Sequence, residues 1–246
     1  LAMELQPTYF DIVRPVVKTQ TPSRAMTVAN AAIASFDEVM LSQLDVVVYL
    51  VNYAACRHTD LALHALELLQ KLSASKKLTG IVDSRSGQRV GNRLVGKIQE
   101  ATDVIAIELS RDFDIDTIDL ESETQPLKCI KAQKLLDLLN GAVTASPNKP
   151  NLAHSLLGLL VGQGSVRPAE IVDDSLFSAG RSLFHTIARC AVELPTTKGS
   201  GNVSWLLAIK SGCLELISKL ATAGLTASLV QSELRNIDFL PALAMQ

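Results

Sequence analysis

The sequence is poor in aromatic residues, which make up only 4% of its 246 positions. Proteins built mainly of strands depend on aromatic and β-branched side chains, whereas Leu and Ala, which dominate this chain, favour helices. The hydrophobic fraction is nevertheless 48%, which is enough to bury a large core. The composition therefore predicts a helical protein of one large domain or two small ones.

The chain also lacks a strong excess of charge and a long apolar run. Its formal net charge is −2, which argues against a general nucleic-acid binder. The run LDVVVYLV is far shorter than the roughly 18 residues of a membrane-spanning helix, so no direct membrane insertion is expected. The N-terminal residues do not have the layout of a signal peptide. Because the chain begins at Leu1 and ends in FLPALAMQ without a helix cap, we expect a piece of a larger protein.

The four cysteines form no C-x-x-C pair, which argues against a common zinc or redox motif. Each lies in or beside an apolar helical pattern. We therefore expect buried, reduced thiols in a cytosolic or nuclear protein. The four residues are Cys56, Cys129, Cys190 and Cys213.

Apolar residues recur at helical spacing along most of the chain, and no convincing strand run appears. The pattern predicts helices over 23–40, 43–55, 59–74, 127–143, 152–160, 176–194 and 203–223, and one or two short helices over 225–243. Thr59 or Asp60 is the expected cap of the third helix, and Asp174 or Ser175 is expected to open the sixth. The 43–55 segment is apolar nearly all round, so it is expected to be central. Trp205 should be at least half buried near the start of its helix.

The predicted buried faces are defined by residues three or four positions apart. They are Leu61, Ala65, Leu68, Leu69 and Leu72; Ala132, Leu135, Leu136, Leu139 and Val143; Phe184, Ile187, Ala188 and Ala191; and Leu206, Ile209, Cys213, Leu216, Ile217 and Leu220.

About nine helices in antiparallel pairs of roughly 40 residues have the spacing of HEAT or armadillo units. We therefore predict an all-α fold, an irregular α-solenoid in which residues 1–246 form a single helical-repeat segment of a longer superhelix. A compact helical bundle is the alternative. An acidic loop is expected at about 111–125, and linker-like loops at about 145–151 and 195–202.

The stretch GNRLVGKI, residues 91–98, resembles the phosphate-binding P-loop signature. Ile98 occupies the position of the hydroxyl residue that would bind magnesium, and no buried strand precedes the glycines. The leucine and isoleucine stripe that follows indicates a helix instead. We expect no bound nucleotide at this stretch.

Residues 112–123 resemble a calcium-binding loop, with Asp112, Asp114 and Asp116 at the first ligand positions and Glu123 at the twelfth. Thr117 stands where a glycine is required, so a solvated acidic loop is the expected structure.

No other motif predicts catalysis, a metal or a cofactor. His185 and Cys190 diverge by about 140° on one helix, so only a tertiary contact could pair them. The stretch GQGSVRP, residues 162–168, has loop composition and no preceding strand, so it is not a dinucleotide fingerprint.

Charge is strongly divided between two neighbouring segments. Residues 71–97 contain seven basic residues and one acidic residue, a net charge of +6, while residues 100–123 contain nine acidic residues and one basic, a net charge of −8. Arg85, Arg89, Arg93 and Lys97 recur every fourth residue and would form one ridge on a helix. The two interpretations are a solvated face beside a neutralising loop, and a docking surface for a charged partner segment.

Several stretches resemble one protein family. The runs NKPNLAHSLLGL, SLFSAGRSLFHTIA, NVSWLLAIKSGCLELISKL and LVQSELRNIDFLPAL look like the giant scaffold nucleoporins of the inner ring, the pair named one-eighty-eight and one-ninety-two in fungi. In the first half, YFDIVRPVV, MTVANAAIASFDEVML and VNYAACRHTDLALHALELLQKLSAS fit the same family. The quoted sequence runs look more like the one-eighty-eight member than the one-ninety-two member.

The resemblance implies a non-enzymatic α-helical scaffold of the nuclear pore complex, located in the nucleus at the nuclear envelope. Its expected partners are other nucleoporins, bound through short linear motifs, and transport receptors. Two rival functions remain open: a HEAT-type transport receptor or adaptor that binds cargo and a small GTPase, and a helical nucleotide-binding enzyme.

Overall fold

The computed structural model describes residues 44–73, 105, 107–113, 127–162, 165–167, 177, 179–194 and 204–245. The density of contacts between Cα atoms divides the chain into two compact units, residues 1–47 and 48–246, and nearly all of the described residues belong to the second. The helix predicted at 23–40, the linker predicted at 195–202 and the P-loop-like stretch at 91–98 lie outside the described residues.

Most of the described elements are helices. In chain order the elements are α4 (Leu44–Ala54), α5 (Thr59–Ser73), the 3₁₀ turn η1 (Arg111–Phe113), α8 (Leu127–Ala145), α9 (Leu152–Leu156), β1 (Leu160–Gly162), β2 (Ser165–Arg167), α10 (Leu183–Glu193), α11 (Ser204–Thr222), α12 (Ala227–Asn236) and α13 (Phe239–Ala244).

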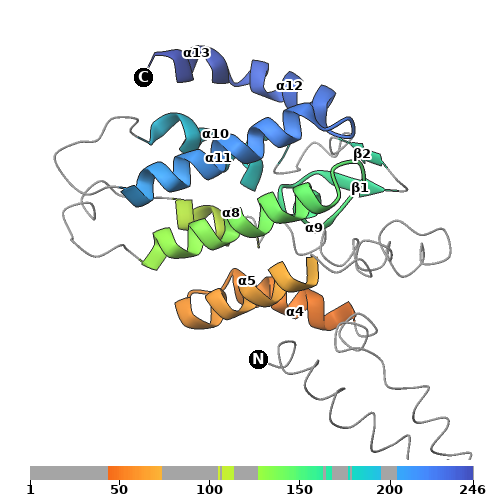
Figure 1. Cartoon of the computed structure of the whole chain (residues 1–246), viewed down its shortest axis with the longest axis vertical. Helices are drawn as coiled ribbons and strands as arrows, with labels where there is room; N and C mark the ends of the chain where they lie inside the picture. The colour runs from red at the N-terminus through yellow and green to blue at the C-terminus, as the bar shows by residue number, and fades with distance from the viewer. Residues whose placement is uncertain are drawn as a thin grey trace, which may run out of the picture. The chain divides into compact units, whose positions relative to one another are not determined.

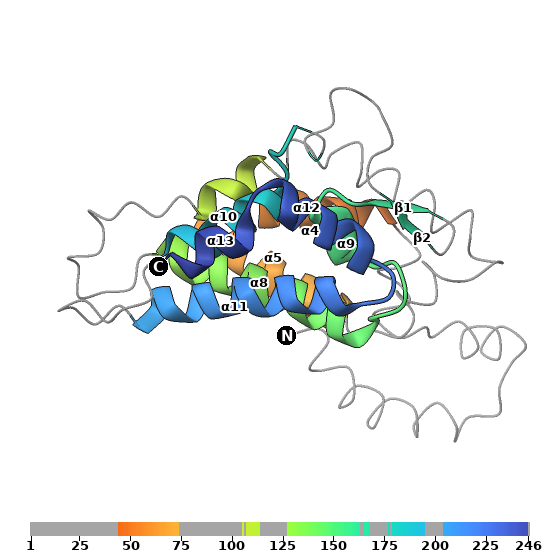
Figure 2. The same cartoon turned by 90° about the horizontal axis from the view of Figure 1, so that it is seen from above.

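The helices of the second unit lie in two layers. Helices α5, α8 and α11 follow one another in one layer, where α8 contacts both of the others (Figure 1). The second layer contains η1, α10, α12 and α13, and it packs on the first through contacts of η1 with α8 and of α10 and α12 with α11 (Figure 2). Helices α8 and α11 run in the same direction, and α12 runs back above them.

This arrangement confirms the all-α, solenoid-like fold class. When one layer repeats the same helix direction and the other carries the returning helices, each pair contacts mainly its neighbours, as in helical-repeat proteins. The apolar stripes predicted on α8, α10 and α11 are buried at every named position, including Leu136 and Cys213. Trp205, the second residue of α11, is partly buried, as predicted.

The buried face of α5 differs from the predicted one by a rotation about the helix axis. Leu61 is 43% exposed, while Ala62 and Leu66 are buried together with Ala65, Leu69 and Leu72. His58, not Thr59 or Asp60, is the residue before the helix, and its carbonyl accepts the first helical bond from Ala62 at 2.9 Å. The stripe alone could not choose between two adjacent faces, and packing against α8 made the choice.

The 43–55 segment, which was expected to be central because it is apolar nearly all round, has an exposed side. Tyr49 and Tyr53 on α4 are exposed, whereas Val51 and Ala54 are buried. A tyrosine ring can lie at the surface because its hydroxyl is polar, so a tyrosine in an apolar run does not require a core position.

Helix α10 begins later than the sequence pattern predicted. Gly180 has a positive φ of 67°, a left-handed conformation that a continuing helix does not allow. Ser182 then occupies the N-cap position in extended conformation, and the helix starts at Leu183. The predicted opening at Asp174 or Ser175 lies outside the described residues.

A short antiparallel hairpin, β1–β2, corrects the prediction that residues 162–168 are a loop with no preceding strand. Val161 pairs with Val166, and Gly162 pairs with Ser165. Each strand has three residues, so neither shows a periodicity that sequence inspection could detect. The hairpin follows α9, which ends near Gly158, a glycine with a φ of 85°.

Candidate functional site

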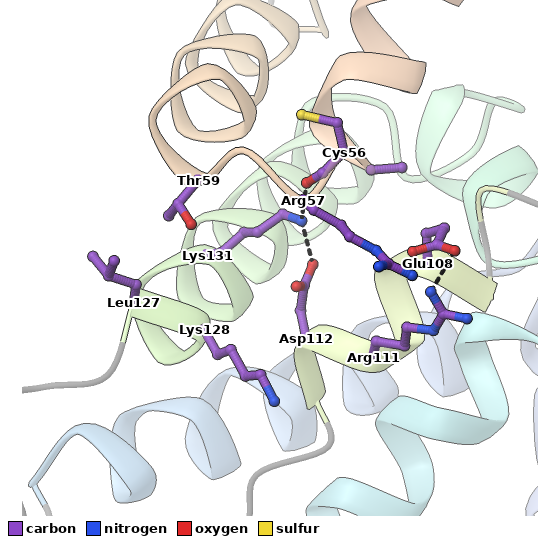
Figure 3. Close-up of a pocket in the computed structure, with 10 residues that line it drawn as sticks. Cys56, Arg57, Thr59, Glu108, Arg111, Asp112, Leu127, Lys128 and Lys131 are labelled. Atoms are coloured by element: carbon purple, nitrogen blue, oxygen red, sulfur yellow. Dashed lines mark hydrogen bonds and ion pairs between the residues drawn. The ribbon is translucent and has the colours of Figure 1, made fainter. Parts of the chain in front are cut away.

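A polar pocket opens between the α4–α5 turn, η1 and the first turns of α8 (Figure 3). Its volume is about 520 Å³. The charged residues that line it are Arg57, Glu108, Arg111, Asp112, Lys128 and Lys131. Four positive side chains therefore face two carboxylates.

A buried ion pair forms the inner wall of this pocket. Nζ of Lys131 on α8 lies 2.9 Å from Oδ2 of Asp112 in η1, and the two side chains are only 7% and 12% exposed. The same ammonium group donates a hydrogen bond of 3.0 Å to the backbone carbonyl of Cys56 in the α4–α5 turn. Lys131 thus ties together the three elements that build the pocket.

Burial of Asp112 has an electrostatic consequence. Desolvation raises the pKa of its carboxyl group above the ordinary value, while the hydrogen bond and the positive charge of Lys131 act in the opposite direction. Because the two charges neutralise each other, we assign Asp112 and Lys131 a structural role rather than a role in ligand binding.

The outer rim carries the remaining charges. Arg111 pairs with Glu108, three positions earlier on the same helical segment. Arg57 and Lys128 are exposed, and neither forms an ion pair with a described residue. The pocket therefore has two uncompensated positive charges at its mouth, which favours a negatively charged ligand group.

Asp112 is the one described residue of the calcium-loop resemblance, and the structure does not place it in a solvated loop. It lies in η1, buried and paired with Lys131. The other ligand positions, Asp114, Asp116 and Glu123, lie outside the described residues. Among the residues that the structure describes, no group of three or more His, Cys, Asp or Glu side chains is placed to hold a metal ion.

The predicted docking residues Arg85, Arg89, Arg93 and Lys97 also lie outside the described residues. Sequence reasoning missed the pocket cations Arg57, Lys128 and Lys131. One signal was available for Lys131: it lies four residues before Leu135, on the buried stripe of α8, where a charged residue requires a partner.

A second polar cluster resembles a catalytic triad. Nδ1 of His185 lies 2.8 Å from Oγ of Ser182, and Nε2 lies 2.9 Å from Oε1 of Glu233. The hydroxyl of Ser182 is fully buried, and the imidazole is packed edge-on against Phe177 and Phe184. The serine is buried, and the three side chains join α10 to α12.

Histidine and cysteine do not meet in a catalytic pair either. Cys190 on α10 lies beside Cys213 on α11, and the hydrogen bond between the thiols together with burial raises the pKa of Cys213. A thiol whose pKa is raised is a poor nucleophile. The four cysteines are thiols outside any disulfide, and all but Cys56 are buried.

A third feature is an apolar groove of about 600 Å³ between α11 and the α12–α13 pair. Ile217, Leu234 and Phe239 contribute to its lining, and Arg235 and Asp238 lie at its polar part. Within the described part of the chain, no helix is both long and apolar enough to cross a membrane.

Comparison with known proteins places the chain in a family. Residues 1–246 match the family described as Nup192, nuclear pore complex scaffold, nucleoporins 186/192/205. The chain belongs to this family of scaffold nucleoporins. It is also 31% identical, over 247 aligned residues, to nucleoporin NUP192 of Chaetomium thermophilum. That alignment covers 97% of the chain and 14% of the relative, so the chain spans about one seventh of the relative's length.

Membership confirms the resemblance found in the sequence at the level of the family. The family is described as a scaffold of the nuclear pore complex, which lies in the nuclear envelope. The structural role and the location expected from the sequence are therefore both confirmed for the family.

Proposed function

We propose that this chain supports nucleocytoplasmic transport by architecture, as a spacing and docking segment of the nuclear pore scaffold, and that it has no enzymatic activity. The observation that carries the proposal is the stack α5–α8–α11, in which α8 contacts both neighbours through buried apolar residues and runs in the same direction as α11. Such a stack holds distant surfaces at fixed separations. The family match supports the same role.

The repeat type and the extent of the unit belong to this proposal. We propose HEAT- or armadillo-like helix pairs, with residues 1–246 forming a single segment of a longer superhelix. The pairing of α10 with α11 and of α11 with α12 supports it, as does the much greater length of the relative.

The choice between the two paralogous scaffold proteins is a separate point. The resemblance of the quoted sequence runs favoured the one-eighty-eight member. The matched family is described by nucleoporins 186/192/205, and the relative is a NUP192, so we propose the one-ninety-two side of the pair.

The proposed partners are other nucleoporins, bound through short linear motifs that lie on the layered surface, with transport receptors as a second class. Grooves between stacked helices accept short helical or extended segments. We also propose that the ridge Arg85, Arg89, Arg93 and Lys97 docks an acidic partner, on the basis of its sequence spacing.

Crosslinking mass spectrometry of the full-length protein in its native assembly tests this function. Crosslinks from lysines of this segment to other pore components are expected, including from Lys97. A charge-reversed ridge, with Arg89, Arg93 and Lys97 changed to Glu, should lose crosslinks or partners that the wild-type protein retains. Partner exchange that depends on GTP would instead support the transport-receptor alternative.

A direct assay addresses the enzyme alternative. Calorimetry with ATP and GTP should show no binding in the micromolar range. Binding that disappears in Lys97→Ala would overturn the scaffold proposal in favour of a nucleotide-binding protein.

A further inference from the structure

We infer that the polar pocket between the α4–α5 turn, η1 and α8 binds an acidic linear segment of a partner protein. The inference rests on the proposed docking function and specifies the chemistry of one site. Figure 3 shows the Lys131–Asp112 pair in the pocket, with Arg57 extending towards Glu108 and Lys128 extending away from the pair.

Most of the charges in the pocket are already satisfied within the chain. Lys131 is held by Asp112 and by the carbonyl of Cys56, and Arg111 is held by Glu108. Both carboxylates of the pocket are therefore engaged by cations that sit beside them. Arg57 and Lys128 remain, both exposed and both without an ion-pair partner among the described residues. A ligand that carries carboxylates would supply ion-pair partners for these two cations.

The start of α8 adds to this positive potential. The first N–H groups of a helix have no partner within the helix, and the helix dipole places partial positive charge there. Acidic side chains usually stand in this turn, yet α8 has none in its first turn and carries Lys128 instead. The helix end and the lysine side chain therefore reinforce one another at the pocket mouth.

The spacing of the cations favours an extended ligand over a single small ion. Arg57 comes from the α4–α5 turn and Lys128 from α8, on different walls of a pocket of about 520 Å³. Leu127, which is 58% exposed, lies on the rim next to Lys128 and offers an apolar contact. A peptide that carries acidic residues around one apolar side chain matches both features.

The described walls of the pocket are joined to one another by buried contacts. The buried Lys131 contacts both the α4–α5 turn and η1. Because the elements are already fixed, binding costs little conformational entropy in the receptor. A nucleic acid is disfavoured, since the chain has a net charge of −2 and the rim has only two uncompensated cations among the described residues.

The test is a selection from a random twelve-residue peptide library displayed on phage, using the 246-residue chain as bait. The charge-reversed variant Arg57→Glu/Lys128→Glu serves for counter-selection. We expect the retained peptides to be enriched in Asp and Glu. Synthetic versions, followed by fluorescence anisotropy, should bind the double variant at least about tenfold more weakly than the wild type, and should weaken with added salt.

The control variant is Arg181→Glu/Arg189→Glu, which makes the same change of charge at two exposed arginines outside the pocket. It should bind the selected peptides within about twofold of the wild type. The exchange Arg57→Lys/Lys128→Arg should restore most of the affinity, because the charges are kept. Thermal melting of every variant verifies that the fold is intact.

Three results would overturn the inference. Retained peptides without acidic enrichment would show that the pocket does not select carboxylates. Equal losses in both double variants would show a response to net charge only. Selection that succeeds only after the acids between 114 and 123 are neutralised would make the chain's own residues the occupant. None of these results touches the scaffold role, which crosslinking in the native assembly tests independently.

Discussion

Nε2 of His185 lies 2.9 Å from Oε1 of Glu233, a contact between α10 and α12 that joins residues 48 positions apart. Because a carboxylate accepts, Nε2 carries the proton of this bond. Nδ1 lies 2.8 Å from the Ser182 hydroxyl, which donates to a neutral ring and accepts from a protonated one. The three side chains form one satisfied polar chain inside an otherwise apolar interface. Their arrangement explains how α12, which buries few apolar residues, is held on the stack.

Removal of the Glu233 carboxylate should loosen α12. In Glu233→Ala the buried imidazole loses its partner, so we expect a loss of about 1–3 kcal/mol in the free energy of unfolding. Urea denaturation of the chain measures it. The control Glu215→Ala removes an exposed partner of Lys219 and should cost less than about 0.5 kcal/mol. Equal effects of the two variants would show that the His185 contact does not stabilise the interface.

The buried pair Lys131–Asp112 should respond asymmetrically to substitution. Lys131→Met leaves the Asp112 carboxylate buried without its cation, with an expected cost of about 3–5 kcal/mol near neutral pH. The double variant Lys131→Met/Asp112→Leu should recover most of this loss, because no buried charge remains. Chemical denaturation of both single variants and the double variant gives the coupling energy.

The same pair predicts a pH dependence. Burial raises the pKa of Asp112 in the folded chain, so the folded state holds this proton more tightly than the unfolded state does. A raised folded pKa gives stability that is present at low pH and lost as the pH rises through it. Lys131→Met should therefore be less destabilised at pH 4 than at pH 7. A penalty that does not change with pH would contradict the assignment.

His154 should make the chain sensitive to mild acid. Its ring is buried in α9, Nδ1 accepts the backbone N–H of Asn151 at 3.1 Å, and desolvation lowers its pKa to about 4. Between pH 6.5 and about 4 the unfolded state takes up a proton that the folded state does not, so stability falls as the pH falls. The loss is at most about 3–4 kcal/mol, because the pKa difference is multiplied by about 1.4 kcal/mol per pH unit.

The variant His154→Gln tests this point. Glutamine can accept the same hydrogen bond at the third helical position, but it does not titrate. Thermal melting should show similar stability at pH 7.5 and a smaller fall towards pH 4 than in the wild type. The exposed His64 provides the control, since His64→Gln should leave the acid profile unchanged. An identical fall in all three proteins would exclude His154 as the source.

Two glycines inside helices should respond differently to alanine. Gly141 in α8 has no atom within 4 Å of an added Cβ, so Gly141→Ala should stabilise the chain by about 0.5–1 kcal/mol through helix propensity. Gly212 in α11 would place its Cβ 3.2 Å from Cδ1 of Leu136 on α8. Gly212→Ala should therefore gain less or lose stability, and Gly212→Val should lose about 1–3 kcal/mol. Urea denaturation measures these changes in the free energy of unfolding. A larger increase for Gly212→Ala than for Gly141→Ala would mean that α8 and α11 are not closely packed at Gly212.

The sequence by itself determined the helical class and the buried faces of α8, α10 and α11. A helix that buries one side must carry apolar residues at a period of 3.6, whatever it packs against, so the stripe from Leu206 to Leu220 was visible without a structure. The family resemblance was visible for a related reason, because the packing residues of a scaffold make up much of its sequence.

Only the tertiary structure decided which adjacent face of α5 is buried, where α10 begins and which polar groups meet. Lys131 reaches Cys56 across 75 positions, and His185 reaches Glu233 across 48. Such pairs produce no periodic pattern in the sequence. Each partner is a single polar residue, and its contact cannot be predicted without knowing where the other residue lies. The pocket beside Lys131 exists for the same reason: stacking alone brought Arg57 and Lys128 to one opening.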